Sequence, residues 1–359
     1  MPKIISHSKP TVSAEDILAV KEQVASGMHA TGPKTKEFEN EMCKFIGVKY
    51  AKATNSGTAA LHLALLSLGV GKGDEVIVPS YVCESVLSAV NYTGAKPVLA
   101  DIDSDFENNG FNISAKTIKP LITKKTKAII VTHLFGVPAN IHEIKKISKK
   151  IPIIEDCAQS IGAGYKGKML GSFGDVSIFS FYATKVISTG HGGMVLTNSR
   201  SLKKNLDNLT QYDKKEKYKI AYNYGLTDIQ SALGLSQLSN LEYFLKRRQE
   251  IAKEYDKAFS GIGLGLPKKI NGEIKFRYII RTKNSTQLKA VKEKLLKKGI
   301  IASQPVFKPL HRCLGLNPKT FKNTEHAQNT NLSIPIYPSL TNEEVDYIKK
   351  SLISSVSSL

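Results

Sequence analysis

One lysine of this sequence stands where a surface lysine is not expected. Lys185 lies in a turn rich in glycine, serine and threonine, between two stretches that predict strands. Residues 175–181 alternate as a half-buried strand does, and residues 192–197 predict another strand. Either the long side chain of Lys185 passes its packed neighbours to reach water, or its amine is held inside the protein to do chemistry.

Two other motifs place polar groups at the ends of predicted elements. Asp156 ends the apolar strand of residues 151–156. It either caps the next segment or meets a cation, because burying an unpaired carboxylate is costly. Ser56, Gly57 and Thr58 begin a predicted helix, where free N–H groups and the helix dipole favour an anion. The same triplet also suits an ordinary helix cap.

These groups are expected at one edge of one sheet, because ligands of open α/β sheets bind beyond the carboxyl ends of the strands. Ser180 ends the strand that precedes Lys185 and belongs to the same edge. An amine, a carboxylate and an anion cradle are what pyridoxal 5′-phosphate (PLP) requires. The amine forms a Schiff base, the carboxylate keeps the ring nitrogen protonated, and the cradle holds the phosphate. The three motifs together therefore predict PLP as the cofactor.

The elements that must position these residues follow a repeated strand–loop–helix pattern from about residue 50 to 200. This alternation predicts an α/β fold with a mostly parallel sheet and helices on both faces. We expect a large cofactor-binding domain over residues 1–240. The predicted helices are 57–69, 83–94, 114–122 and 140–150, and the predicted strands are 50–54, 76–80, 97–101, 128–133, 151–156, 176–181 and 193–198.

The C-terminal part of the chain has a different pattern of predicted elements. Residues 226–259 predict one long helical run, and a Gly/Pro-rich passage follows at 260–273. Residues 275–282, a lysine-rich helix at 285–299 and residues 300–307 then predict a smaller α+β domain, for which we take the range 241–359.

Composition limits the classes of function. The net charge of +20 is spread over scattered lysine pairs without interleaved aromatic residues, which favours a solvated surface over a nucleic-acid-binding face. No apolar run predicts a membrane span or a signal peptide. The four cysteines are far apart and form no CxxC pair, so neither a disulfide framework nor a metal site is indicated, and a reducing cytoplasm is expected.

Long stretches of the chain resemble the DegT/DnrJ/EryC1/StrS family of PLP-dependent sugar aminotransferases. The likeness runs nearly end to end, and its most specific segment is EDCAQ…GSFGD…FSF…TK, within residues 155–185. Other matching segments are SGMHATGPKTKEFENEMCKFIGVKYAKATNSGTAALHLAL, GDEVIVPSYV, HLFGVPANI, YNYGLTDIQSALGLSQL and LSIPIYPSLTNEEV.

The resemblance implies an aspartate-aminotransferase-like fold and a role for individual residues. Lys185 would form the Schiff base, Asp156 would pair with the ring nitrogen, and Gln159 would contact the hydroxyl side of the ring. Asn223 would reach the phosphate in the neighbouring subunit, which implies a homodimer with shared active sites. The remaining implied residues are Ser56, Gly57, Thr58, Cys83 and Ser180 toward the cofactor, and Tyr182 and His311 toward the substrate.

Three positions depart from the pattern of the family. Cys83 stands where relatives place an aromatic residue over the ring, so either the ring is held less firmly or Tyr81 compensates. The alternative is that Cys83 is only a small packing residue. Gly225 replaces a frequent arginine, which removes a contact to the interface or the substrate. His191 replaces a residue that is commonly acidic or glycine, and it either senses substrate charge or is an exposed turn residue.

The implied reaction moves an amino group from glutamate or glutamine to a keto-sugar, expected to be nucleotide-linked. The sequence leaves two alternative functions open. A sugar dehydratase of the same fold would carry histidine in place of Lys185, and a non-enzymatic regulator would use the basic surface to bind nucleic acid.

Overall fold

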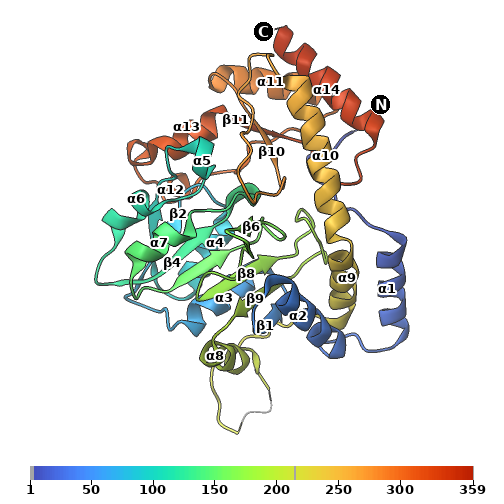
Figure 1. Ribbon diagram of the computed structural model, residues 1–359. Coiled ribbons are helices and arrows are strands. Elements are labelled where there is room, and N and C mark those ends of the chain that lie inside the picture. Colours follow the sequence, from blue (N-terminus) through green and yellow to red (C-terminus); the bar gives the residue numbers. More distant parts are fainter. Residues whose placement is uncertain (1–3, 214–215, 359) are drawn as a thin grey trace.

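The computed structural model describes residues 4–213 and 216–358 of the chain. Its centre is a seven-stranded sheet in the order β1-β9-β8-β5-β4-β2-β3 (Figure 1). The neighbours from β8 to β3 are parallel, and β9 runs antiparallel to both β8 and β1. The predicted mostly parallel sheet is confirmed. Its strands are β1 (Tyr50–Thr54), β2 (Glu75–Pro79), β3 (Lys96–Ala100), β4 (Thr126–Thr132), β5 (Ile153–Asp156), β8 (Val176–Ser180) and β9 (Gly193–Thr197).

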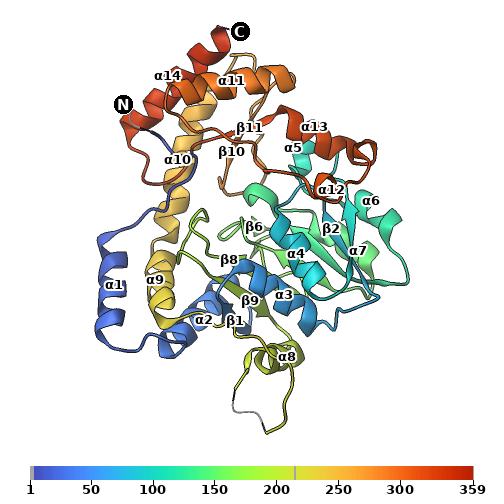
Figure 2. The same ribbon diagram turned by 180° about the vertical axis from the view of Figure 1, so that it is seen from behind.

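Helices cover both faces of this sheet, as the alternation predicts (Figures 1 and 2). Successive side chains of a strand point to opposite faces, so one strand serves two hydrophobic clusters. In β4, Ile130 packs with the cluster of α3 and α4, whereas Ile129 packs with that of α7. The helices of this part are α1 (Ala14–Ala25), α2 (Pro33–Ile46), α3 (Gly57–Ser67), α4 (Glu84–Tyr92), α5 (Phe106–Asn109), α6 (Ala115–Ile118), α7 (Ile141–Ser148), α8 (Arg200–Thr210) and α9 (Asp228–Ser239).

Side-chain caps fix where the helices around the sheet begin. Ser56 caps α3, because its hydroxyl accepts the N–H of Ala59 at 3.1 Å. Thr227 and Gln230 form a reciprocal capping box at the start of α9. Asp228, beside this box, accepts N–H groups from the first turn of α2, which joins the N-terminal helices to α9.

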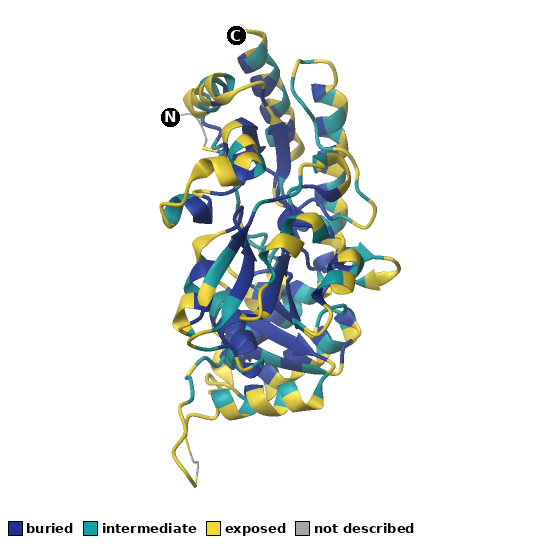
Figure 3. Ribbon diagram, turned by 90° about the vertical axis from the view of Figure 1, so that its left-hand side faces the viewer, coloured by how far each residue is buried: buried dark blue, intermediate teal, exposed yellow. Residues whose placement is uncertain are grey.

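The C-terminal region packs above the carboxyl edge of the sheet. Its strands β10 (Tyr278–Arg281) and β11 (Asn331–Ile334) pair antiparallel, and its buried residues form a second hydrophobic cluster that also takes in Ile5. Figure 3 shows the buried strands at the centre of both parts. The helices here are α10 (Leu241–Phe259), α11 (Ser285–Lys297), α12 (Leu310–Cys313), α13 (Lys322–Thr330) and α14 (Asn342–Ser357). The division at residue 240 stays a prediction.

Two expectations for this part need correction. The helical run 226–259 is two helices, because Asn240 leaves the helical conformation (φ −91°, ψ 1°) between α9 and α10. Residues 300–307 form no strand and contribute only the isolated bridges of Ile300 and Ser303. A further two-stranded hairpin joins β6 (Gly164–Tyr165) and β7 (Lys168–Met169). No helix among the described residues is long and apolar enough to span a membrane.

Glu155 on β5 is a fully buried carboxylate with a structural task. It accepts backbone N–H groups of Gly171 (3.0 Å), Phe173 (2.7 Å) and Gly174 (2.5 Å), and it bonds His133 Nε2 at 3.0 Å. Burial alone would raise the pKa of Glu155, but these donors hold it below the usual value of 4.5. Glu155 therefore anchors the loop that leads into β8.

We expect Glu155→Gln to lower the free energy of unfolding by roughly 3 kcal/mol at neutral pH, because the amide N–H₂ would face backbone donors. A carboxyl with a lowered pKa contributes stability above its unfolded value and loses it as the pH falls. The difference between variant and wild type should therefore shrink below pH 4.5. Urea unfolding measures both effects.

Glu107→Gln is the matched control, because Glu107 makes an exposed ion pair with Lys268. It should cost no more than about 1 kcal/mol. Equal unfolding midpoints for wild type and Glu155→Gln would contradict the structural role.

Candidate active site

A cavity of about 520 Å³ lies at the carboxyl edge of the sheet, below the C-terminal region. Nine of the predicted site residues line it, although they come from four separate stretches of the sequence: Ser56, Gly57, Thr58, Cys83, Asp156, Gln159, Ser180, Tyr182 and Lys185. The volume is within the range of small-molecule and cofactor sites.

The strand order explains this convergence. β5 lies between β4 and β8 with all three parallel, so Asp156 at the end of β5 faces the ends of its neighbours. Ser180 ends β8 and pairs with Gly193, which in turn pairs with Thr54 at the end of β1. The turn after β1 therefore delivers the start of α3 to the same edge.

Lys185 lies in the loop between β8 and β9, as predicted. Backbone bonds close this loop, and the Lys185 N–H donates to the carbonyl of Tyr182 at 2.8 Å. The amine lies 5.8 Å from the centre of the Phe276 ring. Burial lowers the pKa of the Lys185 amine and the charge of Arg277 lowers it further, while Asp156 acts in the opposite direction. Such an amine is more readily freed of its proton than a surface lysine.

Asp156 is a buried carboxylate with few donors of its own. It accepts the N–H of Ala158 at 3.0 Å and the hydroxyl of Thr132 at 3.3 Å. Burial raises its pKa despite these bonds and the nearby charge of Lys185. A cation placed beside Asp156 would reverse that shift, and a protonated ring nitrogen is such a cation.

The start of α3 forms a cradle for an anion. The first N–H groups of a helix have no partner within it, so those of Gly57 and Thr58 are free to meet a ligand. Gly57 is packed against Ser180, and a Cβ added there would lie 2.8 Å from Ser180 Cβ. Only glycine therefore brings the helix start this close to the Ser180 hydroxyl.

Cys83 and Gln159 complete the wall around these groups. Cys83 precedes α4, and its thiol lies 2.8 Å from the Ser85 hydroxyl. Tyr81 is fully buried against Phe111 and Phe135 and does not line the cavity, so it does not replace the missing aromatic residue. Gln159 accepts the N–H of Phe135 at 3.0 Å, which fixes its amide.

Two predicted site residues do not reach this cavity. His311 is fully buried and bonds Ser80 and Glu325, both at 2.7 Å, while its ring stacks on Phe321. His311 therefore supports the cavity wall from the side that faces away from the cavity. Asn223 is exposed on the chain after α8, outside the cavity lining.

Comparison with known proteins identifies the type of site. The sequence profile of the DegT/DnrJ/EryC1/StrS aminotransferase family matches residues 10–353. The chain belongs to this family. It is 36% identical to GDP-perosamine synthase of Escherichia coli O157:H7 over 372 residues, which cover 98% of each protein.

Solved structures of aminotransferases have the same fold as this chain. Helicobacter pylori PseC, an aminotransferase of pseudoaminic acid biosynthesis, superposes with a TM-score of 0.91 at 29% identity, over 99% of this chain and 100% of PseC. The PLP form of Spr1654 from Streptococcus pneumoniae gives a TM-score of 0.90 at 29% identity, over 99% of each chain. The protein is thus a PLP-dependent sugar aminotransferase with the type I fold of its family.

Sequence reasoning missed part of the cavity wall of this family member. Phe276 and Arg277 line the cavity from the C-terminal region, whereas the sequence indicated only a strand there. The sequence did contain an indication that Arg277 belongs to the site, because this charged residue stands between the aromatic residues Phe276 and Tyr278. His191, one of the three departures, also lines the cavity, edge-on to Tyr182 at 5.2 Å between ring centres.

We expect borohydride to attach PLP covalently to Lys185 in the wild type and in Asp156→Asn alike. The variant should nevertheless lose turnover by several orders of magnitude, because a neutral amide does not hold the ring nitrogen protonated. Peptide mapping and steady-state kinetics measure the two effects. An adduct on another lysine would reject the assignment of Lys185, and near-normal turnover would remove Asp156 from the mechanism.

Proposed function

We propose that this protein transfers an amino group from glutamate or glutamine to a nucleotide-linked keto-sugar. The observation that carries the proposal is the joint placement of the Lys185 amine, the Asp156 carboxylate and the Gly57–Thr58 cradle around one cavity. The names of two relatives, a GDP-perosamine synthase and an enzyme of pseudoaminic acid biosynthesis, support a sugar substrate. The net charge of +20 suits an anionic nucleotide-linked substrate.

Lys185 has two tasks in the proposed reaction. When bound, PLP supplies a reactive aldehyde and a ring that accepts electrons. Lys185 holds the cofactor through its amine, and after the amino donor has displaced it, the freed amine takes the proton from the α-carbon of the donor. The lowered pKa of Lys185 favours this step, because a base needs its unprotonated form.

The other residues of the proposed site hold the cofactor and orient it. Asp156 stabilises the proton on the ring nitrogen, and its own burial strengthens that interaction. Gly57, Thr58 and Ser180 bind the phosphate at the start of α3. Phe276 covers the Lys185 amine and excludes water from it.

We also propose a homodimer in which each subunit completes the other's site. The chain after α8 projects from the sheet region (Figures 1 and 2). It exposes the large side chains of Tyr212, Tyr218 and Ile220 close to Asn223. Exposed apolar side chains of this kind are typical of surfaces that pack against another chain. A cytoplasmic location is part of the proposal, and the four free cysteines support it.

The function is tested with ¹⁵N-glutamate and a panel of nucleotide-linked keto-sugars. We expect one of them to become an amino sugar that carries the label, identified by mass spectrometry. Lys185→Ala is the control and should give no labelled product. If no sugar of the panel accepts nitrogen from glutamate or from glutamine, the proposed reaction is wrong.

Shared sites predict complementation between two inactive variants. Lys185→Ala and Asn223→Ala homodimers should each be impaired, the second through weaker cofactor retention. Subunit exchange should then restore up to about a quarter of the wild-type sites, since half of the randomly mixed dimers carry one intact site. Activity that stays at the level of the unmixed variants would argue against shared sites.

A further inference from the structure

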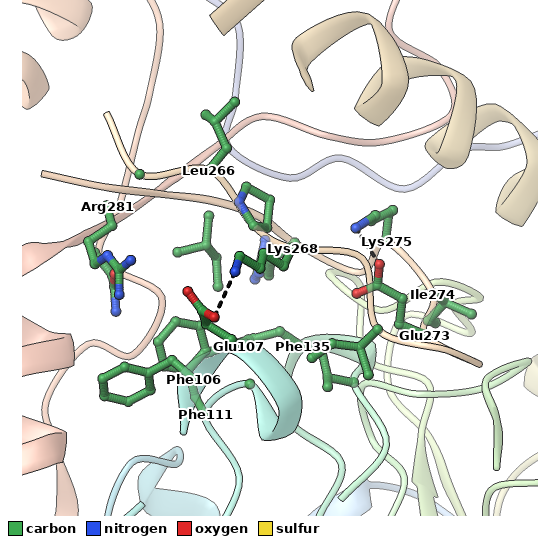
Figure 4. Close-up of a pocket in the computed structure, with 18 residues that line it drawn as sticks. Phe106, Glu107, Phe111, Phe135, Leu266, Lys268, Glu273, Ile274, Lys275 and Arg281 are labelled. Atoms are coloured by element: carbon green, nitrogen blue, oxygen red, sulfur yellow. Dashed lines mark hydrogen bonds and ion pairs between the residues drawn. The ribbon is translucent and has the colours of Figure 1, made fainter. Parts of the chain in front are cut away.

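The cavity of the active site adjoins a second, smaller cavity of about 120 Å³ (Figure 4). Phe135 and Arg277 line both of them. The positively charged side chains around the second cavity are not equivalent, because carboxylates neutralise two of them. Figure 4 shows the ion pairs of Lys268 with Glu107 and of Lys275 with Glu273.

Arg277 lacks such a partner. Within residues 4–213 and 216–358, no carboxylate lies at ion-pair distance from its guanidinium, which instead donates through Nη1 to Ser8 Oγ at 2.6 Å and to His7 Nδ1 at 3.2 Å. These two bonds use the hydrogens of Nη1. The Nη2 and Nε hydrogens form the other edge of the fork, and no described side chain accepts them. Burial lowers the pKa of Arg277 to about 10, so it stays charged at neutral pH.

His7 orients Arg277 without neutralising it. Its Nδ1 faces Arg277 Nη1, so Nε2 carries the proton and donates to Ser333 Oγ at 2.9 Å. Burial and the charge of Arg277 lower the pKa of His7 to about 3, and the ring is therefore neutral. The nearby Arg248 is buried, and among the described residues it donates only to backbone carbonyls. Arg277 is half-buried, and a charge that is partly removed from water without a counter-ion favours an anion at this wall of the cavity.

The position of Arg277 indicates which anion it meets. Both cations of this wall lie near the Phe276 ring, with the Lys185 amine 5.8 Å and the Arg277 guanidinium 4.8 Å from its centre. The phosphate cradle is on a different element, at the start of α3. An anion on Arg277 is thus close to the amine that takes a proton from the substrate.

We propose that Arg277 binds the α-carboxylate of the amino donor through the free edge of its guanidinium. This inference rests on the proposed function, in which the donor is glutamate or glutamine. The α-carboxylate is one bond away from the carbon whose proton Lys185 takes, so one wall of the cavity positions both groups. A planar guanidinium fork matches a carboxylate with two parallel hydrogen bonds.

The test compares the holoenzyme with Arg277→Gln and Arg277→Lys. The conversion of bound PLP to its amino form, followed by absorbance, gives the apparent affinity for the donor without any sugar. We expect Arg277→Gln to weaken it roughly 10- to 100-fold, and Arg277→Lys to weaken it less, because lysine keeps the charge but not the fork. The affinity for PLP and the KM for the keto-sugar should stay within about twofold of the wild type.

Arg281→Gln is the matched control, because Arg281 is an exposed arginine at the end of β10, four residues after Arg277, and of the two cavities it lines the second. It should behave as the wild type. Comparing glutamate with glutamine as donors shows which carboxylate Arg277 binds, since both have the α-carboxylate but only glutamate has a second one on its side chain. Equal losses for both donors in Arg277→Gln support the proposal, and a loss for glutamate alone overturns it.

Two further results would overturn the proposal. A raised KM for the keto-sugar with unchanged donor affinity would assign Arg277 to a substrate phosphate. A lower thermal stability with unchanged affinities would make Arg277 a structural residue. Binding of glutarate, an unreactive dicarboxylate, to the holoenzyme is measured by calorimetry and needs no turnover. If the wild type aminates no sugar but binds glutarate, and Arg277→Gln does not, the proposed function fails while the anion site stands.

Discussion

The burial of the Asp156 carboxylate at the end of β5 is the constraint on which the rest of the site depends. Its neighbour Glu155 is also buried, but four donors satisfy it and lower its pKa. Among the described residues, Asp156 accepts only the Ala158 N–H and the Thr132 hydroxyl, and burial raises its pKa. Of the two adjacent buried carboxylates, Glu155 thus stabilises a loop, whereas Asp156 is available to a cation, which in the proposed mechanism is the ring nitrogen of the cofactor.

The arrangement of charge around the cavity follows from that constraint. In the proposed site, neutral donors at the start of α3 would receive an anion through their N–H groups, without a buried positive charge. The half-buried cations Lys185 and Arg277 lie on the other elements of the wall, both near the Phe276 ring. If both proposed anion-binding places are correct, their separation on different elements would keep the cofactor and the substrate in distinct positions.

The seven strands of the central sheet could be predicted to within two residues at each end, because short apolar runs bounded by glycine, proline or polar residues indicate strands in an α/β chain. Lys185 and Asp156 could be predicted for the same reason, since each is a charge attached to such a run. Arg277 met the same criterion and was missed, because only the fold brings its strand to the opposite side of the cavity. The break at Asn240 and the burial of His311 behind the wall depend on tertiary packing, which a local pattern does not contain.

Of the three departures from the family pattern, Cys83 and His191 line the cavity, whereas Gly225 does not. Gly225 is packed against Thr31, and a Cβ there would lie 2.6 Å from the Thr31 hydroxyl, so the arginine common in the family would displace that residue. Cys83 leaves space that an aromatic ring occupies in relatives, and the buried Tyr81 does not fill it. Cys83 and His191 therefore differ from the family pattern in the wall of the same cavity that holds Lys185 and Asp156, which follow it.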